Sequence, residues 1–390
     1  MYKKFDFEVI KTDGKARCGV LNTPHGGIRT PAFIFCATKA AMKGVWPEQL
    51  ERANTQIILS NTYHLFLNPG GDNVRKMGGL HKMLNWNKPM LTDSGGFQIF
   101  SFGHGSVADE IKGKRVGRKS LLKITDEGAS FRSYWDGSYK LLTPEKSIET
   151  QKDLGADLVV VLDECTPFHI SRKYTEKSLQ RSHNWELRSL KRFAELNDGS
   201  QALYGIIQGG IYPDLRKLGA EFVSENNFFG TAIGGTLGQT KDQMHEVVDM
   251  AFQNLNTSRP IHLLGIGGIS DIFNGVSLGI DTFDCVHPTR IARHGGALVR
   301  PEFRDIQNKE HINIKNAKYE HDNTPIDDQC GCECCKQFSK SYLHYLLKAR
   351  EMLAIQAISV HNIFFMNSLM EKIRVAINNN TFEKLRKEWL

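Results

Sequence analysis

Eight short runs of apolar residues, rich in Val, Ile, Leu and Phe, recur along the chain between longer mixtures of polar and apolar positions. A continuous apolar run indicates a strand buried on both faces, and a mixed segment between two runs indicates a helical crossover. Eight such strands favour a closed (β/α)8 barrel over an open sheet. We therefore predict an α/β fold with strands at residues 32–36, 56–60, 89–93, 157–163, 202–208, 230–234, 261–265 and 281–286.

Two regions do not follow this rhythm. Residues 101–145 are polar and basic, with a turn expected at Trp135-Asp136-Gly137-Ser138, and we interpret them as an insertion near the pocket. Residues 303–362 contain a cysteine cluster and a helical stretch at 342–361, which predicts a C-terminal zinc-binding subdomain inserted in the barrel. Residues 363–390 are expected to form a charged amphipathic helix. The whole chain, 1–390, is thus predicted to be one catalytic barrel domain with these additions.

Composition and charge narrow the classes of function. The chain is 40% hydrophobic and 24% charged, begins with a charged segment, and has no run near the ~18 apolar residues that span a bilayer. We expect a cytoplasmic protein with no membrane partner. The formal charge is +7, and basic residues gather without acids at 112–123 and 285–301. Such clusters suit RNA, although a solvated surface explains them equally well unless they flank a pocket.

Four of the eight cysteines lie within six residues, at 330–335. Cys330, Cys332 and Cys335 with the later His361 make a Cys3His set of the kind that tetrahedral zinc prefers. A closed set leaves no position for a reacting water, so this zinc would hold structure. A redox or incidental thiol cluster is the alternative. Cys334 is surplus and receives no role.

Aspartates end several predicted strands. Asp93, Asp163 and Asp284 each follow an apolar run, and the strand ends of a parallel barrel converge on the face where active sites form. A single such aspartate is usually a turn or cap residue. Three of them favour a site.

A pair of carboxylates can divide a glycosidic exchange into two steps, one attacking the anomeric carbon and the other moving the proton. Asp93 and Asp284 are the candidates for this pair. Asp163, Gln208 and the backbone of Gly234-Gly235 offer donors and acceptors for a purine edge. Phe97 suits stacking on the base, and a core aromatic is the alternative.

At these residues the sequence resembles the tRNA-guanine transglycosylase family, in its bacterial form, over nearly the whole chain. The resemblance rests on the order and spacing of many motifs: Ser60-Asn61-Thr62-Tyr63-His64-Leu65, residues 92–98, Asp163-Glu164-Cys165-Thr166-Pro167-Phe168, Gln208-Gly209-Gly210, Phe283-Asp284-Cys285-Val286, Pro288-Thr289-Arg290 and the Cys3His set.

The resemblance implies a modified TIM barrel with one structural zinc ion per subunit, usually a homodimer. Such an enzyme replaces guanine at the wobble position of GUN-anticodon tRNAs by a 7-deazaguanine base, with Asp284 as nucleophile and Asp93 as general acid/base. It implies base-binding roles for Ser94, Gly95, Gly96, Phe97, Asp163, Cys165, Gln208, Gly234, Gly235 and Thr236. It implies RNA contacts from Gly265, Ile266, Gly267, Gly268, Ile269, Ser270 and Asp271, and from Thr289, Arg290, Ile291, Ala292 and Arg293.

The chain departs from the bacterial pattern around the base. Phe97 stands where tyrosine is common, the turn at 234–239 is one residue shorter, and Gln239 replaces a glutamate. A roomier turn would also admit queuine, whereas Cys165 matches the bacterial pattern and favours the smaller 7-aminomethyl-7-deazaguanine, prequeuine. We expect prequeuine, with queuine as the alternative. A non-catalytic tRNA-binding partner subunit and an unrelated barrel hydrolase are the competing functions. The first would be expected to lack one of the two aspartates, and the second would not need the arginines after Asp284.

Overall fold

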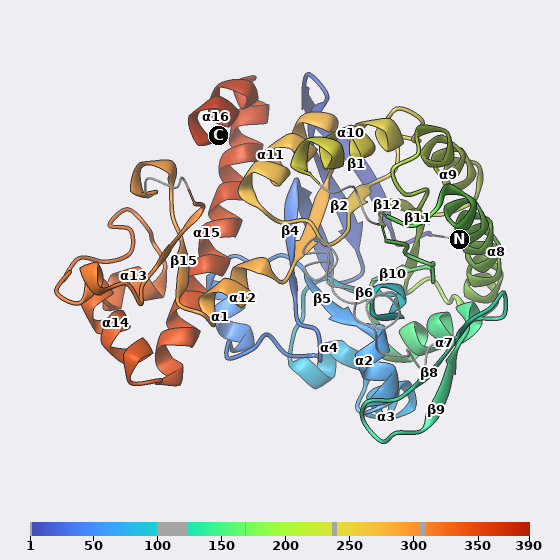
Figure 1. Ribbon diagram of the computed structural model, residues 1–390, viewed down its shortest axis with the longest axis horizontal. Coiled ribbons are helices and arrows are strands. Elements are labelled where there is room, and N and C mark those ends of the chain that lie inside the picture. The colour runs from blue at the N-terminus through green and yellow to red at the C-terminus, as the bar shows by residue number, and fades with distance from the viewer. Residues whose placement is uncertain (1, 100–122, 168, 236–239, 305–308) are drawn as a thin grey trace.

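The computed structural model describes residues 2–99, 123–167, 169–235, 240–304 and 309–390. Eight parallel strands form a closed barrel in chain order, with the last strand beside the first (Figure 1). Each strand overlaps its predicted run, and in the longest one all six residues are buried. The predicted α/β barrel is confirmed. Its strands are β4 (Ala32–Cys36), β5 (Ile58–Asn61), β6 (Met90–Asp93), β10 (Leu158–Val160), β11 (Ala202–Ile207), β12 (Gly230–Ile233), β13 (Ile261–Leu263) and β14 (Thr282–Cys285).

Helices connect consecutive strands on the outside of the barrel (Figure 1). Their apolar faces pack on the strands, and their polar faces meet solvent. They are α1 (Pro47–Arg52), α2 (Thr62–Leu67), α3 (Gly71–Lys76), α4 (Gly79–Leu84), α7 (Pro144–Leu154), α8 (Arg172–Leu196), α9 (Pro213–Glu225), α10 (Lys241–Phe252) and α11 (Ile269–Leu278).

The helix that follows the eighth barrel strand, α15 (Met352–Asn378), comes only after an inserted subdomain. It packs on β4 on one side and on the subdomain on the other (Figure 1). Within the described ranges it is the one helix long and apolar enough to span a membrane, with a mean hydropathy of 1.3, but 61% of that stretch is buried as protein core. The subdomain between β14 and α15 consists of α12 (His287–Ala292), β15 (Gly296–Leu298), η1 (Pro301–Phe303), β16 (His311–Asn313), η2 (Ala317–Tyr319), α13 (Glu333–Gln337) and α14 (Lys340–Lys348).

Helix boundaries near the C-terminus differ from the predicted ones. The helical stretch expected at 342–361 is divided between α14 and α15, because Arg350 adopts a positive φ of 61° that a helix cannot continue through. The single helix expected at 363–390 is likewise two elements. Helix α15 ends at Asn378, and α16 (Phe382–Trp389) follows after Asn380 at φ 54°.

Within the described residues, two three-stranded antiparallel sheets accompany the barrel, and β15 and β16 pair as a two-stranded antiparallel sheet in the subdomain. The first, which the sequence did not indicate, comprises β1 (Asp6–Asp13), β2 (Ala16–Thr23) and β3 (Gly26–Thr30). The second lies in the predicted insertion and comprises β7 (Lys123–Ile124), β8 (Ala129–Arg132) and β9 (Tyr139–Leu142), with the predicted turn at Trp135-Asp136-Gly137-Ser138 between its last two strands. The basic cluster at 112–123 lies outside the described residues except for Lys123.

Candidate active site and metal centre

The three predicted aspartates lie at the carboxyl ends of barrel strands. Asp93 is the last residue of β6, Asp284 lies in β14, and Asp163 follows β10. Between β14 and β6 the barrel order places β4 and β5, which end in Cys36 and Asn61. One rim of the barrel therefore carries Asp284, Cys36, Asn61 and Asp93 on successive strands.

Asp93 is held by neutral donors. The Asn61 side-chain amide donates to Oδ2 at 2.6 Å, and the backbone N–H of Thr62 donates to Oδ1 at 3.0 Å. Burial, and to a lesser extent the charge of Asp284, raise the pKa of Asp93 to about 7 despite these hydrogen bonds. A carboxyl group with this pKa exchanges its proton readily near neutral pH, as a general acid/base must. The effect of Asp284 also means that the two carboxyl groups are close enough to interact.

Asp284 has one oxygen fixed and the other lightly contacted. Its Oδ1 accepts the backbone N–H of Gly265 at 2.8 Å and lies 3.2 Å from Nε2 of His262. Among the described residues, its Oδ2 has a hydrogen-bonding contact only with the weakly donating thiol of Cys36, with 3.6 Å between sulfur and oxygen. Burial, followed by the charge of Asp284, raises the pKa of Cys36 well above its usual value, so the thiol stays protonated. The Oδ2 atom is the one available to a substrate.

Asp163 and Gln208 form a second polar group at the same end of the barrel. The Gln208 side-chain amide donates to Asp163 Oδ2, and burial raises the pKa of this carboxyl to about 6. The backbone of Gly96 and Gly235 approaches so closely that an added Cβ would lie 2.4 Å from Asp163 Oδ1 and 2.3 Å from Gln208 Oε1 respectively. Only glycine allows this approach, which leaves backbone and side-chain groups together where a planar base can bind.

A buried arginine braces the turns that carry this group. Arg216, on α9, donates from Nε to the carbonyl of Gly210 at 2.7 Å and from Nη1 to the carbonyl of Gly234 at 2.8 Å. It thereby ties the turn after β11 to the turn after β12. Ser94 similarly accepts the N–H of Gly96 at 3.2 Å, and Cys165 is buried beside these residues. Phe97 is half exposed, and Thr236 lies outside the described residues.

The two segments expected to contact RNA differ in accessibility. Thr289 and Ala292 are buried, whereas Arg290 is exposed and Arg293 is partly exposed, donating to the Thr289 carbonyl at 3.0 Å. In the other segment, Gly265 donates to Asp284. The Ile269 and Ser270 amides are already bonded to Glu310, at 2.9 and 3.1 Å.

The Cys3His residues lie together in the inserted subdomain. Their ligand atoms are all within 4.8 Å of one another, and the three sulfurs of Cys330, Cys332 and Cys335 lie 3.7, 3.5 and 3.3 Å from Nδ1 of His361. A tetrahedral ion with metal–sulfur bonds of ~2.3 Å and metal–nitrogen bonds of ~2.1 Å requires about 3.6 Å here. The other ring nitrogen, Nε2, is bonded to the Leu298 carbonyl at 2.8 Å, which leaves Nδ1 free of a proton for a metal. The residues fit a zinc ion.

A second cluster of possible ligands does not have metal-binding geometry. The rings of His25 and His81 are stacked 3.6 Å apart at 14°, above Asp157. The lone pairs of two parallel imidazoles lie in their ring planes and so do not converge on one ion. Asp157 Oδ2 also already accepts the Met90 N–H at 2.9 Å.

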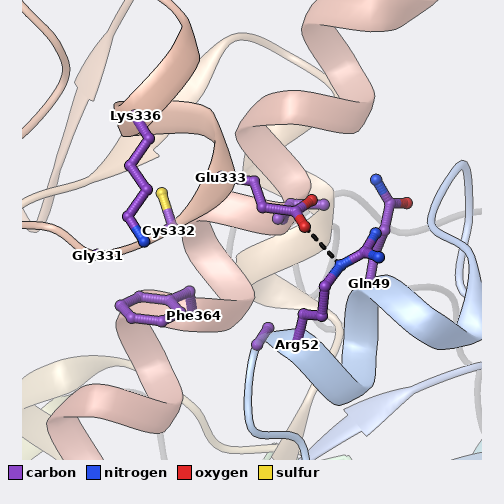
Figure 2. A pocket seen from close by; sticks show the side chains of 9 residues that line it. Gln49, Arg52, Gly331, Cys332, Glu333, Lys336 and Phe364 are labelled. Atoms are coloured by element: carbon purple, nitrogen blue, oxygen red, sulfur yellow. Dashed lines mark ion pairs between the residues drawn. The ribbon is translucent and has the colours of Figure 1, made fainter.

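A cavity of about 290 Å³ has Cys332 of the Cys3His set in its lining (Figure 2). None of the aspartates Asp93, Asp163 and Asp284 lines it. It is formed by α1, by the segment around α13 and by α15. Arg52 of α1 and Glu333 of α13 make a 2.5 Å ion pair across it. The charges of Arg52 and Glu333 neutralise each other, and the carboxyl groups of the barrel rim do not line this cavity. We therefore interpret it as space left where the subdomain packs against the barrel.

The closed barrel, its carboxyl-lined rim and the Cys3His subdomain define a TIM-barrel enzyme with a separate metal centre. Residues 12–390 match the family model described as Queuine tRNA-ribosyltransferase. Relatives carrying that name include proteins of Roseiflexus sp. (strain RS-1), 45% identical over 99% of this chain and 98% of the relative, and of Chlamydia muridarum (strain MoPn / Nigg), 45% identical over 96% of this chain and 98% of the relative. The chain belongs to the queuine tRNA-ribosyltransferase family and is therefore a pentosyltransferase.

Sequence reasoning missed several residues of the site. Asn61 stood in a motif that carried the resemblance but received no role. Cys36 and His262 lie within or at the end of apolar runs and gave no separate signal, although a histidine inside a buried strand is itself unusual. Gly265 was expected to contact RNA, and its backbone N–H also donates to Asp284, a contact that the sequence did not indicate.

Proposed function

We propose that the protein exchanges guanine at the wobble position of GUN-anticodon tRNAs for a 7-deazaguanine base, in queuosine biosynthesis or salvage. The observation that carries this proposal is the pair of carboxyl groups on one barrel rim. Asp93 has a pKa of about 7, and Asp284 presents one uncommitted oxygen. The partly exposed Arg293 and the exposed Arg290 follow Asp284 closely in the chain, where they can meet the RNA beside the reacting nucleotide.

In the first step Asp284 Oδ2 attacks C1′ of the flipped nucleotide, the bond from C1′ to guanine breaks, and Asp93 supplies the proton that guanine takes away. In the second step the incoming base gives its proton to Asp93 and attacks C1′, and the bond from C1′ to Asp284 breaks. The exchange returns both carboxyl groups to their initial state. The phosphodiester backbone is untouched, and no oxidant or energy source is consumed.

Asp163, Gln208 and the Gly235 backbone are proposed to bind the purine edge, with Phe97 on the ring face. The proximity of Asp163 and Gln208 and the close approach of Gly96 and Gly235 support this assignment. We propose prequeuine as the incoming base because Cys165, buried beside this group, follows the bacterial pattern.

The experiment that tests the reaction is incorporation of labelled guanine into GUN-anticodon tRNA, with a tRNA of another anticodon as control. Label in the first tRNA alone is expected, and label in neither would contradict the proposal. Competition between prequeuine and queuine for guanine-loaded tRNA then tests the incoming base. Preferential incorporation of queuine would reverse that assignment.

We further propose one structural zinc ion held by Cys330, Cys332, Cys335 and His361. Cys332→Ala is expected to lower metal content from about one ion per chain toward zero and to lower the Tm. Cys334→Ala is the matched control, since this buried cysteine lies outside the ligand set, and it should keep its metal. Full metal content in Cys332→Ala would contradict the ligand assignment. A cytoplasmic homodimer remains our proposal for the assembled enzyme, on the family resemblance.

A further inference from the structure

His262 lies beneath Asp284 in the wall of the barrel and is fully buried. It belongs to β13, where it pairs in register with Thr282 of β14. Because side chains alternate along a strand, Thr282 and Asp284 point to the same face, and the His262 ring reaches both. Its Nδ1 lies 2.9 Å from the Thr282 hydroxyl, and its Nε2 lies 3.2 Å from Asp284 Oδ1.

These contacts determine which ring nitrogen carries the proton. A carboxylate oxygen only accepts, so Nε2 must donate, because a bare nitrogen lone pair would repel Oδ1 at this distance. The Thr282 hydroxyl can donate to Nδ1 and so favours this tautomer. Thr282, His262 and Asp284 thus form a chain of hydrogen bonds in which each donor points toward Asp284. No proton transfer along this chain is required.

We infer that His262 is a positioning residue that, together with the Gly265 amide, holds Asp284 Oδ1 and so presents Oδ2 to the ribose. This inference rests on the proposed nucleophilic role of Asp284. The terminal torsion of an aspartate is soft, so a single donor does not prevent the carboxylate from tilting or exchanging its two oxygens. Two donors on one oxygen, the His262 side chain from within β13 and the Gly265 amide from the turn that follows it, fix both the plane of the group and the identity of the attacking atom.

The test compares two His262 variants in a single-turnover assay of the covalent enzyme–RNA adduct at saturating GUN-anticodon tRNA. His262→Phe keeps the ring volume but removes the donor, and adduct formation should slow by roughly 10- to 100-fold, the effect of a misplaced reacting group. His262→Gln retains a side-chain N–H and should return to within about 5-fold of wild type. The tRNA concentration giving half-maximal rate should change less than about 3-fold in both, since neither variant touches the RNA surface.

A threonine pair supplies a matched control. Thr282→Val removes the hydroxyl that orients the ring and should slow adduct formation by about 3- to 10-fold. Thr231→Val makes the same change on β12, where the buried hydroxyl has no hydrogen-bond partner among the described residues, and should leave the rate unchanged. If His262→Phe does not fold, this pair decides the question alone.

The inference is overturned if His262→Gln is as slow as His262→Phe, or if Thr282→Val and Thr231→Val have equal rates, because either result indicates a packing role. Failure of the proposed function gives a different result. In that case wild-type enzyme forms no adduct, or Asp284→Asn forms it as wild type does.

Discussion

Buried aspartates occur at both ends of the barrel, but they are neutralised in different ways. At the end of the barrel where the strands begin, which we call the closed end, Asp281 makes a buried ion pair with Arg17, and Asp157 lies against His25 and His81. At the opposite end, where the strands finish and which we call the open end, Asp93, Asp163 and Asp284 are contacted by amides, a thiol and a histidine. Among the described residues no lysine or arginine pairs with them.

The difference separates carboxyl groups that hold the fold from those available for chemistry. Burial would raise the pKa of Asp157, but hydrogen bonds from His25, His81 and the Met90 amide outweigh burial and lower it. Burial raises the pKa of Asp93 to about 7, since its neutral donors compensate less. Burial raises the pKa of Asp281 as well, to about 6 even beside Arg17, so the two ends differ in the partners of their carboxyl groups rather than in pKa alone. The buried ion pair with Arg17 commits Asp281 to the fold. A carboxyl group held only by neutral donors at the open end keeps the affinity for a proton or carbon that catalysis needs.

The largest expected effect tests the open end. Asp284→Asn keeps the shape and the contacts to Oδ1 but removes the attacking oxygen, so base exchange should fall by more than about 10³-fold and no denaturant-resistant adduct should form. The measurement is label exchange together with denaturing electrophoresis, and the Tm should stay close to wild type. A persistent adduct would remove Asp284 from the nucleophile role.

The next effect tests the closed end. Arg17→Met leaves Asp281 buried without its cation, and breaking such a pair costs about 3–5 kcal/mol of unfolding free energy. Lys15→Met is the matched control, because its ion pair with Asp249 is solvent-exposed and is worth less than about 1 kcal/mol. Urea unfolding measures both. Equal losses of unfolding free energy in the two variants would mean that the Arg17–Asp281 pair stabilises the fold no more than an exposed pair does. Loss of base exchange in a folded Arg17→Met protein would contradict the assignment of a purely structural role to this end of the barrel.

Asp93→Asn should sharpen the comparison through pH. A folded-state pKa raised from 3.8 to about 7 means that the folded protein binds more protons than the unfolded chain between these values, so wild-type stability falls as pH rises through 7. The amide does not ionise. The variant should therefore gain a few degrees in Tm over wild type at pH 8 and almost none at pH 4, while exchange activity is lost. A Tm difference independent of pH would contradict the raised pKa.

The smallest effect concerns His25. Its hydrogen bond to Asp157 raises the pKa of His25, so its contribution to stability is complete below the unfolded value near 6.5 and is lost as pH rises through the raised value. His25→Asn should lose less than about 1 kcal/mol at pH 5.5, because the side chain is partly exposed, and less still at pH 9. Exposed His321→Asn serves as the control. A greater loss of unfolding free energy at pH 9 than at pH 5.5 would contradict the assignment of a positive charge to His25 in its hydrogen bond with Asp157.

Local pattern was enough to predict the barrel, because strands such as β11 are buried on both faces and read as continuous apolar runs. The position of each aspartate relative to its run also placed Asp93, Asp163 and Asp284 at the open end. The sequence did not show which residues far apart in the chain contact each other. The sheet β1–β3 was missed because most of β1 is exposed or half-buried, and its key contact joins Arg17 to a residue 264 positions away. The role of His262 likewise depends on register with a neighbouring strand.

Helix α15 contributes His361 to the metal centre and also packs on β4 as the last helix of the barrel. Ion binding and completion of the catalytic domain thus draw on the same segment, and the two equilibria are thermodynamically linked. Any ion that stabilises the subdomain also favours the closed barrel, and a chain interrupted before residue 352 lacks both. During synthesis the packing of α15 on β4, and with it the complete barrel, can form only after the residues of α15, 352–378, have emerged.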